Sequence, residues 1–267
     1  MKKLLLLGMA MVLTAALVGC GGGDDRRVIA GPGLVGIDDR TVDTAPLLSV
    51  TYTVPPSTLL FTADIVSDQT SDGDIEFDPV LNTFFVTMGP PVVLFGEDSL
   101  NGNFPEFRAF LTFPLDGSTG QPAIPSTAVI VSAFLDVLVD QVSFASVVPS
   151  FLDLVQYPIA GLSAADFNSV PLDFITLDFF FDDPGNFVRI NVTQFMQLAQ
   201  LPPALLDFQV RFLVDTGIGP LTMSRTTSKK AVRTVHPPPR SLDKMLLNRG
   251  LSSGNALTPA DNTSRHR

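Results

Sequence analysis

Short segments in which apolar and polar residues alternate are the feature that most constrains the fold of this chain. In residues 208–214 every second side chain is apolar, and the residues between them include Gln209. Segments 107–113, 175–181 and 188–192 repeat the pattern. Because successive side chains of a strand point to opposite faces of a sheet, this alternation predicts half-buried strands of packed antiparallel sheets.

Further strands are expected in the rest of the body. The segment 128–139 also fits a helix, because Asp136 and Asp140 stand four residues apart, but its Val and Ile content favours a strand. A short helical turn is expected over 192–198. With turn residues between them, about nine strands predict an all-β fold, a jelly-roll-like antiparallel β-sandwich over residues 43–222. The remaining expected strands are 47–54, 59–66, 83–88 and 92–96.

The N-terminus carries the pattern of an export signal. Residues 1–3 are Met-Lys-Lys and residues 4–18 are almost entirely apolar. The apolar stretch is too short to span a bilayer comfortably, which is typical of a signal peptide. It runs into the tetrapeptide Leu-Val-Gly-Cys at 17–20. This tetrapeptide resembles the lipobox of bacterial lipoproteins, in which the cysteine, here Cys20, is lipidated and becomes the mature N-terminus.

We therefore predict a lipoprotein signal peptide over residues 1–19, lipidation of Cys20 and a flexible tether over 20–42. The acyl chains, palmitate among them, would anchor the protein firmly, because each buried methylene contributes about 0.8 kcal/mol. In a bacterium with two membranes, Gly21 stands where inner-membrane lipoproteins commonly carry Asp, which favours the outer membrane or the cell surface. An ordinary secretory signal with a chance cysteine is the alternative.

Charge is unevenly distributed along the chain. The formal net charge is −10, but residues 21–224 carry 25 acidic and 6 basic residues, whereas residues 225–267 carry 2 acidic and 9 basic residues. A body this acidic repels phosphates, so we expect no binding to nucleic acid. The basic segment 223–267 shows no alternation and predicts a disordered tail. Translation of this tail out of frame is a second interpretation.

The scarcity of His and Cys limits the possible chemistry. Both histidines, His236 and His266, lie in the tail, and Cys20 is the only cysteine. The body therefore lacks the residues for a Ser–His–Asp or Cys–His arrangement and for a zinc site built on these ligands. Acidic residues are plentiful, but nothing in the sequence singles out a glycosidase-type carboxylate pair. We expect a protein without catalytic activity.

The acidic segment 67–78 is the best candidate for a metal site. Asp68, Asp72, Asp74 and Asp78 concentrate hard oxygen ligands around a glycine, as calcium-binding loops do. The spacing does not match an EF-hand, because no Glu stands at the twelfth position. The alternative is an aspartate-rich turn whose side chains accept hydrogen bonds from their own backbone.

Four segments of the body resemble, in the right order, motifs of one family of β-sandwich domains. Residues 107–115 resemble an R-x-F-L-x-F-D-L strand, and residues 123–135 resemble an A-x-I-x-S-A-x-L-x-L element. Residues 191–195 are similar to a V-D-V-T turn into a short helix, and residues 207–212 to a G-F-x-L-R strand. These are motifs of the DNRLRE-type family, which overlaps carbohydrate-binding module family 96. The resemblance covers about residues 75–215.

This resemblance implies a jelly roll, often found on exported or surface-attached proteins. The family's closing strand, P-x-L-x-V-x-Y, is not recognisable after residue 215, and a similar segment stands instead at 43–52. Either the domain is permuted and this segment supplies the missing strand, or the segment is the remnant of an upstream repeat.

Part of the family binds carbohydrate, but this chain has few of the aromatic residues that usually hold sugars. Trp is absent, and Tyr52 and Tyr157 are the only tyrosines. Phe104, Phe110 and Phe187 are expected on the outer faces of their strands, toward solvent, a second layer or a partner. We expect a membrane-anchored, extracytoplasmic lipoprotein with a structural or non-catalytic binding domain at the cell surface. The alternative is a carbohydrate-binding module for surface or environmental polysaccharide; another surface protein is a further possible partner.

Overall fold

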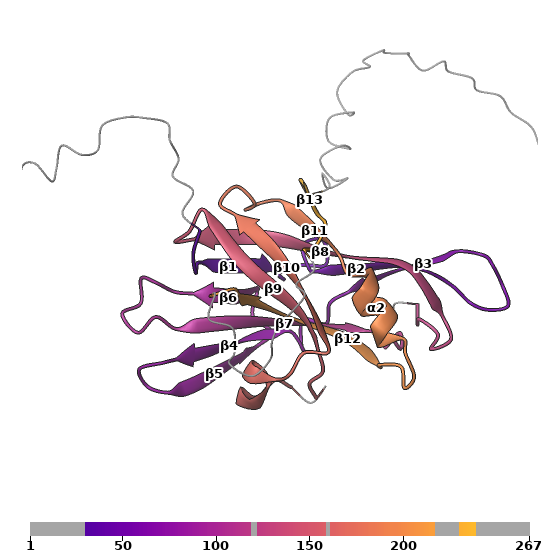
Figure 1. The fold of residues 1–267 in the computed structure, drawn as a ribbon, viewed down its shortest axis with the longest axis horizontal. Helices are drawn as coiled ribbons and strands as arrows, with labels where there is room; N and C mark the ends of the chain where they lie inside the picture. The colour runs from indigo at the N-terminus through magenta and orange to yellow at the C-terminus, as the bar shows by residue number, and fades with distance from the viewer. Residues whose placement is uncertain (1–29, 119–121, 159–160, 217–229, 239–267) are drawn as a thin grey trace, which may run out of the picture.

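The computed structural model describes residues 30–118, 122–158, 161–216 and 230–238. This part of the chain is built from strands, one 3-10 turn and one short α-helix (Figure 1). All pairings between its named strands are antiparallel. The prediction of an all-β, antiparallel, sandwich-like fold is therefore confirmed. The predicted signal peptide, 1–19, and Cys20 lie outside the described residues.

The described residues form thirteen strands, more than the alternation predicts, together with η1 (Ala164–Asn168) and α2 (Thr193–Ala199). The strands are β1 (Leu34–Asp38), β2 (Leu47–Thr53), β3 (Phe61–Val66), β4 (Gly73–Asp78), β5 (Thr83–Met88), β6 (Val92–Glu97), β7 (Glu106–Pro114), β8 (Val129–Ser143), β9 (Val147–Val155), β10 (Asp173–Phe180), β11 (Phe187–Asn191), β12 (Asp207–Val214) and β13 (Arg233–His236).

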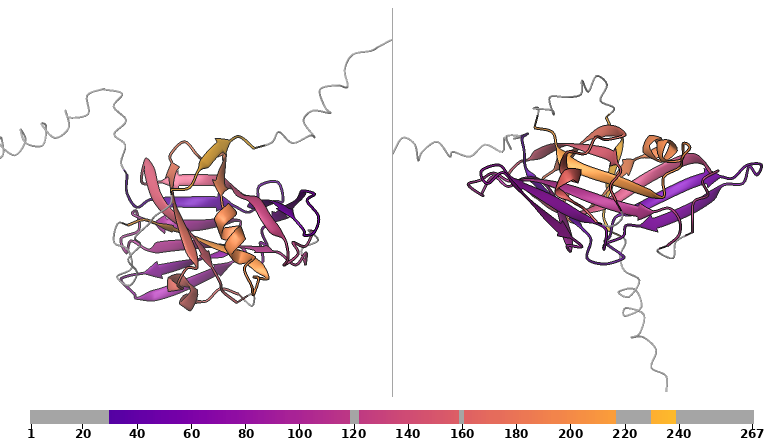
Figure 2. Two further views of the ribbon diagram at one scale, coloured as in Figure 1. Left: turned by 45° about the vertical axis from the view of Figure 1, so that its right-hand side comes forward. Right: turned by 90° about the horizontal axis from the view of Figure 1, so that it is seen from below.

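The strands form one strongly curled sheet in the order β10-β9-β12-β7-β6-β1-β8-β11-β13 (Figure 2). The β2–β3 pair extends from β8, and the β4–β5 hairpin extends from β7. Strand β8 belongs to both layers, because its first part pairs with β2 and its last part with β1. The ambiguous segment 128–139 is thus a strand, and its Asp136 binds Arg189 of β11 at 2.8 and 2.6 Å.

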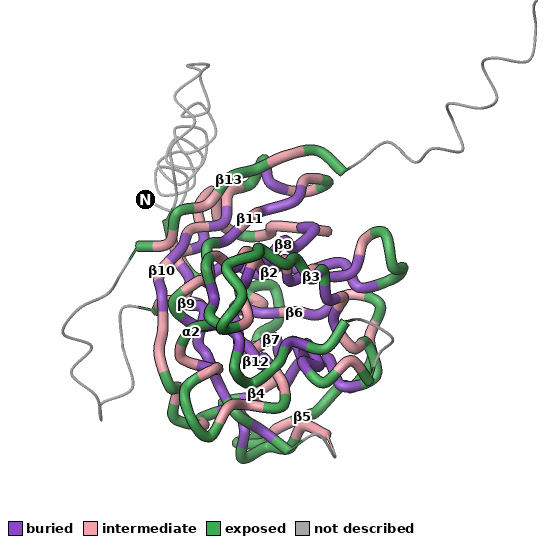
Figure 3. The backbone as a smooth tube through the Cα atoms, turned by 90° about the vertical axis from the view of Figure 1, so that its right-hand side faces the viewer, coloured by how far each residue is buried: buried purple, intermediate pink, exposed green. Residues whose placement is uncertain are grey.

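The main core lies between the layers of the curled sheet. Alternate residues of β12, including Phe208 and Phe212, point into it and are fully buried. The Phe212 ring stacks on Phe95 at a centroid distance of 5.3 Å, and Phe95 meets the edge of Phe179 at the same distance. Buried positions follow the middle strands, whereas exposed positions gather at the hairpin ends (Figure 3). Burial of the alternating apolar residues therefore determines which strand faces point inward.

A second, smaller core lies on the opposite face of the sheet, under the β4–β5 hairpin and η1. Phe110 belongs to it and is fully buried, so this residue faces a second layer and not solvent. Tyr157 meets its ring edge-on at a centroid distance of 5.5 Å. The Tyr157 hydroxyl forms a 2.6 Å hydrogen bond with the Thr112 hydroxyl. Both faces of the sheet near β7 are therefore covered by protein.

Two predicted boundaries are wrong. The tether expected over 20–42 contains β1, a strand buried along its whole length between β6 and β8. The tail expected over 223–267 contains β13, which pairs with β11. Its Arg233 donates to Asp183 at 2.6 Å, so a basic residue of the tail neutralises an acid of the body. The segment 43–52 contributes β2, which pairs with both β3 and β8 inside the sheet.

Candidate functional site

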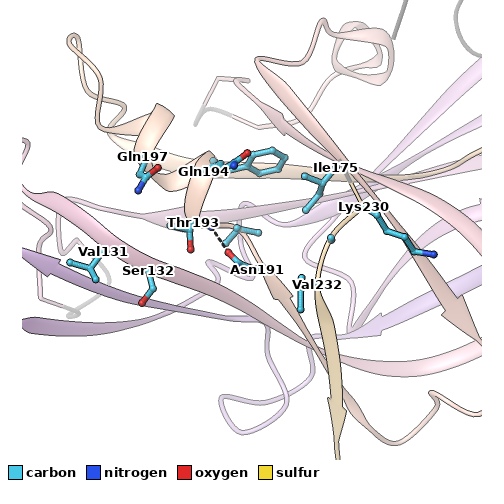
Figure 4. A pocket seen from close by; sticks show the side chains of 12 residues that line it. Val131, Ser132, Ile175, Asn191, Thr193, Gln194, Gln197, Lys230 and Val232 are labelled. Carbon is cyan, nitrogen blue, oxygen red and sulfur yellow. Dashed lines mark hydrogen bonds between the residues drawn. The ribbon is translucent and has the colours of Figure 1, made fainter. Parts of the chain in front are cut away.

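A pocket of about 490 Å³ opens beside helix α2 (Figure 4). Its walls come from three stretches that are far apart in the sequence: strand β8, the β11–α2 junction and the segment 230–232. Ile175 of β10 closes the remaining side. The polar side chains in its lining are those of Ser132, Asn191, Thr193, Gln194, Gln197 and Lys230.

Hydrogen bonds to β8 fix the position of α2 and with it one wall of the pocket. The Asn191 side chain accepts from the backbone N–H of Thr193 at 3.0 Å, which supports the first turn of the helix. The Thr193 hydroxyl accepts from the N–H of Ala133 at 2.9 Å and donates to the carbonyl of the same residue at 3.3 Å. Gln197 donates to the carbonyl of Ile130 at 3.2 Å. The helix also buries Phe195, so it cannot move without opening the core.

The opposite wall belongs to the segment that the sequence predicts as a tail. The N–H of Ala231 donates to the carbonyl of Thr176 on β10 at 2.8 Å. The Lys230 ammonium lies 3.1 Å from the carboxylate of Asp178, and its side chain is largely exposed. Val232, also in the lining, is 72% exposed. This wall is therefore polar at one end and apolar at the other.

The lining supplies amides, hydroxyls, one amine and aliphatic side chains, and it contains no carboxylate. Amide and hydroxyl groups both donate and accept hydrogen bonds, so they complement a neutral ligand rich in hydroxyl or amide groups. The single aromatic residue of the lining, Phe195, is buried in the core and offers no exposed ring. The arrangement can bind a polar molecule, and its lining contains no pair of acids for hydrolysis.

The aromatic residues singled out in the sequence lie elsewhere. Phe104 is 52% exposed, in the turn between β6 and β7. Phe187 is buried and stacks on His236 of β13 at a centroid distance of 5.6 Å. Tyr52 and Tyr157 are both buried. Neither tyrosine is therefore placed to contact a sugar.

The structure does not bring the four predicted calcium ligands together. Within the described residues, no group of three or more Asp, Glu, His or Cys side chains is arranged to hold a metal ion. Asp78 accepts from the N–H groups of Val80 and Leu81 at the β4–β5 turn. Asp68 accepts from the N–H of Thr70, two residues further along. These two carboxylates cap local turns, as the alternative interpretation of the segment expects.

The other two aspartates of that segment are buried in different surroundings. Asp74 accepts from the N–H of Leu94 at 3.1 Å, and burial raises its pKa to about 6. Asp72 accepts from the N–H of Thr112 at 2.6 Å. Burial, and next the charge of Asp39, raise the pKa of Asp72 well above its usual value. Asp39 and its role could not be foreseen, because it lies far from the acidic segment in the sequence.

Comparison with known proteins adds no relative. A scan against protein-family models and searches of curated proteins and of solved structures found no match to this chain. Within the described residues, no helix combines the length and the apolar character needed to cross a bilayer. The chemistry of the site therefore rests on its own geometry.

Proposed function

We propose that this protein is an extracytoplasmic lipoprotein, anchored by acyl chains on Cys20, whose β-sandwich has a non-catalytic structural or binding role at the cell surface. The observation that carries the proposal is the tetrapeptide Leu-Val-Gly-Cys at 17–20, directly after a basic and then apolar N-terminus. The first described residue, Ala30, follows Cys20 closely. Only a short connection therefore separates the anchor from the folded domain.

Several properties of the domain support a binding role rather than catalysis. The pocket beside α2 is lined by amides and hydroxyls without a carboxylate. His236 lies outside its lining and stacks on Phe187 at the β11–β13 edge. The amides and hydroxyls can recognise a ligand through hydrogen bonds, and neither kind of group acts as a base at neutral pH.

The anchor is tested by expressing the full chain in a bacterium with two membranes and separating membrane from soluble fractions. We expect the protein in the membrane fraction, with the mass of its N-terminal fragment showing a Cys20 that carries acyl chains. The Cys20→Ala variant should lose this mass and leave the membrane. An unmodified wild-type protein that is recovered from the soluble fraction would refute the proposal.

A second candidate function, carbohydrate binding, is favoured by one observation: the amide-rich lining of the pocket. Gln194 and Gln197 project from one turn of α2, opposite Ser132 of β8 (Figure 4). Amide side chains that alternate with aliphatic ones suit the mixed polar and apolar surface of a sugar ring. The ligand would be a neutral saccharide, because the lining contains a single charged side chain.

This function is tested by retention on a panel of insoluble neutral polysaccharides. Gln194→Ala should weaken retention about tenfold, the effect of losing one good hydrogen bond. Gln156→Ala is the matched control, because Gln156 is also exposed but lines a different pocket. If neither wild type nor control is retained, or if both variants bind equally, the pocket is not a sugar site.

A further inference from the structure

Four buried oxygen atoms near the β3–β4 connection have no hydrogen-bond partner. They are both carboxylate oxygens of Asp39, Oδ2 of Asp72 and the hydroxyl of Ser67. Asp39 is 1%, Asp72 0% and Ser67 8% exposed. Unpartnered buried oxygens are costly, because each has lost its hydration without replacement. Four such oxygens in three neighbouring side chains require a cation or a hydrogen-bond donor to offset this cost.

Three separate parts of the fold hold these side chains together. Asp39 follows β1, and its N–H donates to the carbonyl of Pro91 at 3.0 Å. Ser67 follows β3, and Gln69 of the same loop donates to the carbonyl of Asp39 at 2.7 Å. Asp72 precedes β4 and is fixed by the N–H of Thr112 on β7. The cluster is therefore part of the rigid sheet, and it joins the two loops to β7.

The three side chains act on one another. Burial is the largest effect and raises the pKa of both carboxyls, the charge of Asp39 raises the pKa of Asp72 further, and the Ser67 hydroxyl offsets part of both shifts. The other charges that act on the pair are also acidic, those of Asp38 and Asp68. None of the ion pairs among the described residues includes Asp39 or Asp72. Within the part of the chain that the structure describes, these carboxyls therefore face negative charge and form no ion pair that would compensate it.

A shared proton would leave this group charged. A proton held between the two carboxyls and the proton of the Ser67 hydroxyl make two hydrogen bonds, which join four oxygens, but one proton balances only one of the two negative charges. A divalent cation can accept electron pairs from all four oxygens and balances two negative charges. Carboxylate and hydroxyl oxygens are hard ligands, which suit calcium better than a transition metal.

We propose that Asp39, Ser67 and Asp72 form a buried calcium site that ties the β1–β2 and β3–β4 loops to strand β7. The site shares Ser67 and Asp72 with the segment 67–78 that the sequence singles out, and Asp72 is its only member among the four predicted ligands. Because calcium takes six to eight oxygen ligands, backbone carbonyls or water would complete its shell. The role of the ion is structural: it neutralises charge at a junction of three elements and leaves the pocket beside α2 unchanged.

The test measures thermal unfolding of the full-length protein at pH 7.5, first treated with EGTA and then supplied with CaCl2. A bound ion stabilises the folded state according to its concentration relative to Kd, so saturating calcium should raise Tm by about 5 °C or more. Isothermal titration with CaCl2 should give one saturable binding event. The Asp39→Asn variant removes one charge and one ligand, and should weaken calcium binding at least tenfold.

The variant also reports on the apo protein. Without calcium, Asp39→Asn should melt higher than wild type, because it removes repulsion from Asp72. A folded variant with a higher apo Tm and a reduced calcium response supports the site. Asp78→Asn is the control: Asp78 caps the β4–β5 turn, so this variant should keep the wild-type rise in Tm.

Three outcomes would overturn the site. These are the absence of both heat and Tm change with CaCl2, an undiminished response in Asp39→Asn, or a response that Asp78→Asn abolishes instead. In the first case a proton, and not a cation, neutralises the pair. None of these three outcomes depends on lipidation of Cys20 or on sugar binding, so this site can fail while the proposed function stands.

Discussion

The guanidinium of Arg211 donates to the carboxylate of Asp153 at 2.7 Å, with both side chains almost completely buried. The same guanidinium donates to the carbonyls of Asp166, Phe167 and Ser169, so it holds η1 against the sheet. The pair connects β12 with β9 in the middle of one layer. It is the only pair among the described ion pairs in which both side chains are at most 3% exposed.

Removing one partner of this pair should destabilise the protein strongly. Arg211→Met leaves the charge of Asp153 buried and releases two carbonyls of η1 and that of Ser169 just after it, so we expect the free energy of unfolding in urea to fall by about 3–5 kcal/mol. Arg40→Met is the control, because Arg40 is half exposed where it pairs with Asp140. This control substitution should lower the free energy of unfolding by less than about 1 kcal/mol. Equal losses in the two variants would contradict this interpretation.

Stability without calcium should depend on pH through Asp39. Burial first, and then the charges of Asp38 and Asp68, raise the pKa of Asp39 to about 7. Because this value lies above that of the unfolded chain, the folded protein binds more protons, and the stability from Asp39 is lost as pH rises toward 7. The free energy of unfolding of Asp39→Asn, minus that of wild type, should therefore rise by about 2–3 kcal/mol from pH 5 to pH 8.

The measurement is urea unfolding in EGTA at each pH, with Asp182→Asn as a variant in an exposed turn. Taking the difference between wild type and variant removes the titration of carboxyls on which Asp39 does not act, such as Asp74, and leaves that of Asp39 together with its effect on Asp72. A difference that stays constant from pH 5 to pH 8 would show that Asp39 titrates normally.

The segment after residue 229 should contribute measurably to stability. Arg233 donates to the Asp183 carboxylate and to the Asp178 carbonyl, and its guanidinium lies over the Phe180 ring at 4.8 Å. Arg233→Ala removes these contacts at a mostly buried position, so we expect a loss of about 2 kcal/mol in urea unfolding. Lys230→Ala, at an exposed ion pair, should cost less than about 1 kcal/mol. If Arg233→Ala has the same free energy of unfolding as wild type, this segment does not pack on the body in solution.

Strand β5 should promote association of the protein. Among the described strands it pairs only with β4, and Phe85, Val86 and Met88 on it are each at least 39% exposed. An exposed apolar edge strand can pair with another chain. Phe85→Lys should therefore reduce light scattering at high concentration with little change in Tm.

The neighbouring residue provides the control for that experiment. Phe84 packs on Phe77 and Phe167 at centroid distances of 4.8 and 5.2 Å. Phe84→Lys should lower Tm, because it places a charge in the smaller core. If Phe85→Lys lowers Tm as much, the face assignment of β5 is wrong.

Alternation predicted the strands in which polar residues stand between apolar ones, including β12, whose Gln209 and Arg211 are themselves buried. Strands β2, β5, β6 and β12 begin within one residue of their expected positions. Strand β1 was not predicted, because all of its residues are buried and no polar face alternates with an apolar one. Strand β4 was not predicted for the opposite reason. Asp74 and Glu76 stand between its apolar residues, and these acidic residues indicated a metal-binding loop instead of a strand.

The sites were harder to predict than the strands. The pocket collects residues from β8, the β11–α2 junction and 230–232, and only the fold brings these together. The motif at 191–195 predicted the turn into α2, but nothing in it indicates a facing wall. Asp39 likewise carries no local signal, and Ser67, although it begins the acidic segment 67–78, was not among the predicted ligands, because the environment of both residues depends on Asp72 and β7. Local periodicity reports burial of a face, whereas a site depends on long-range register.

The position of β1 has a consequence for the order of assembly. Leu34 pairs with Gly96 on one side and with Ser143 on the other, so the first strand of the domain finds its neighbours only after more than half of the described chain has emerged. Pairing over such sequence separations slows folding and leaves an apolar segment exposed meanwhile. If the chain crosses a membrane N-terminus first, as the proposed function requires, this segment must be kept from aggregating until β8 has also crossed.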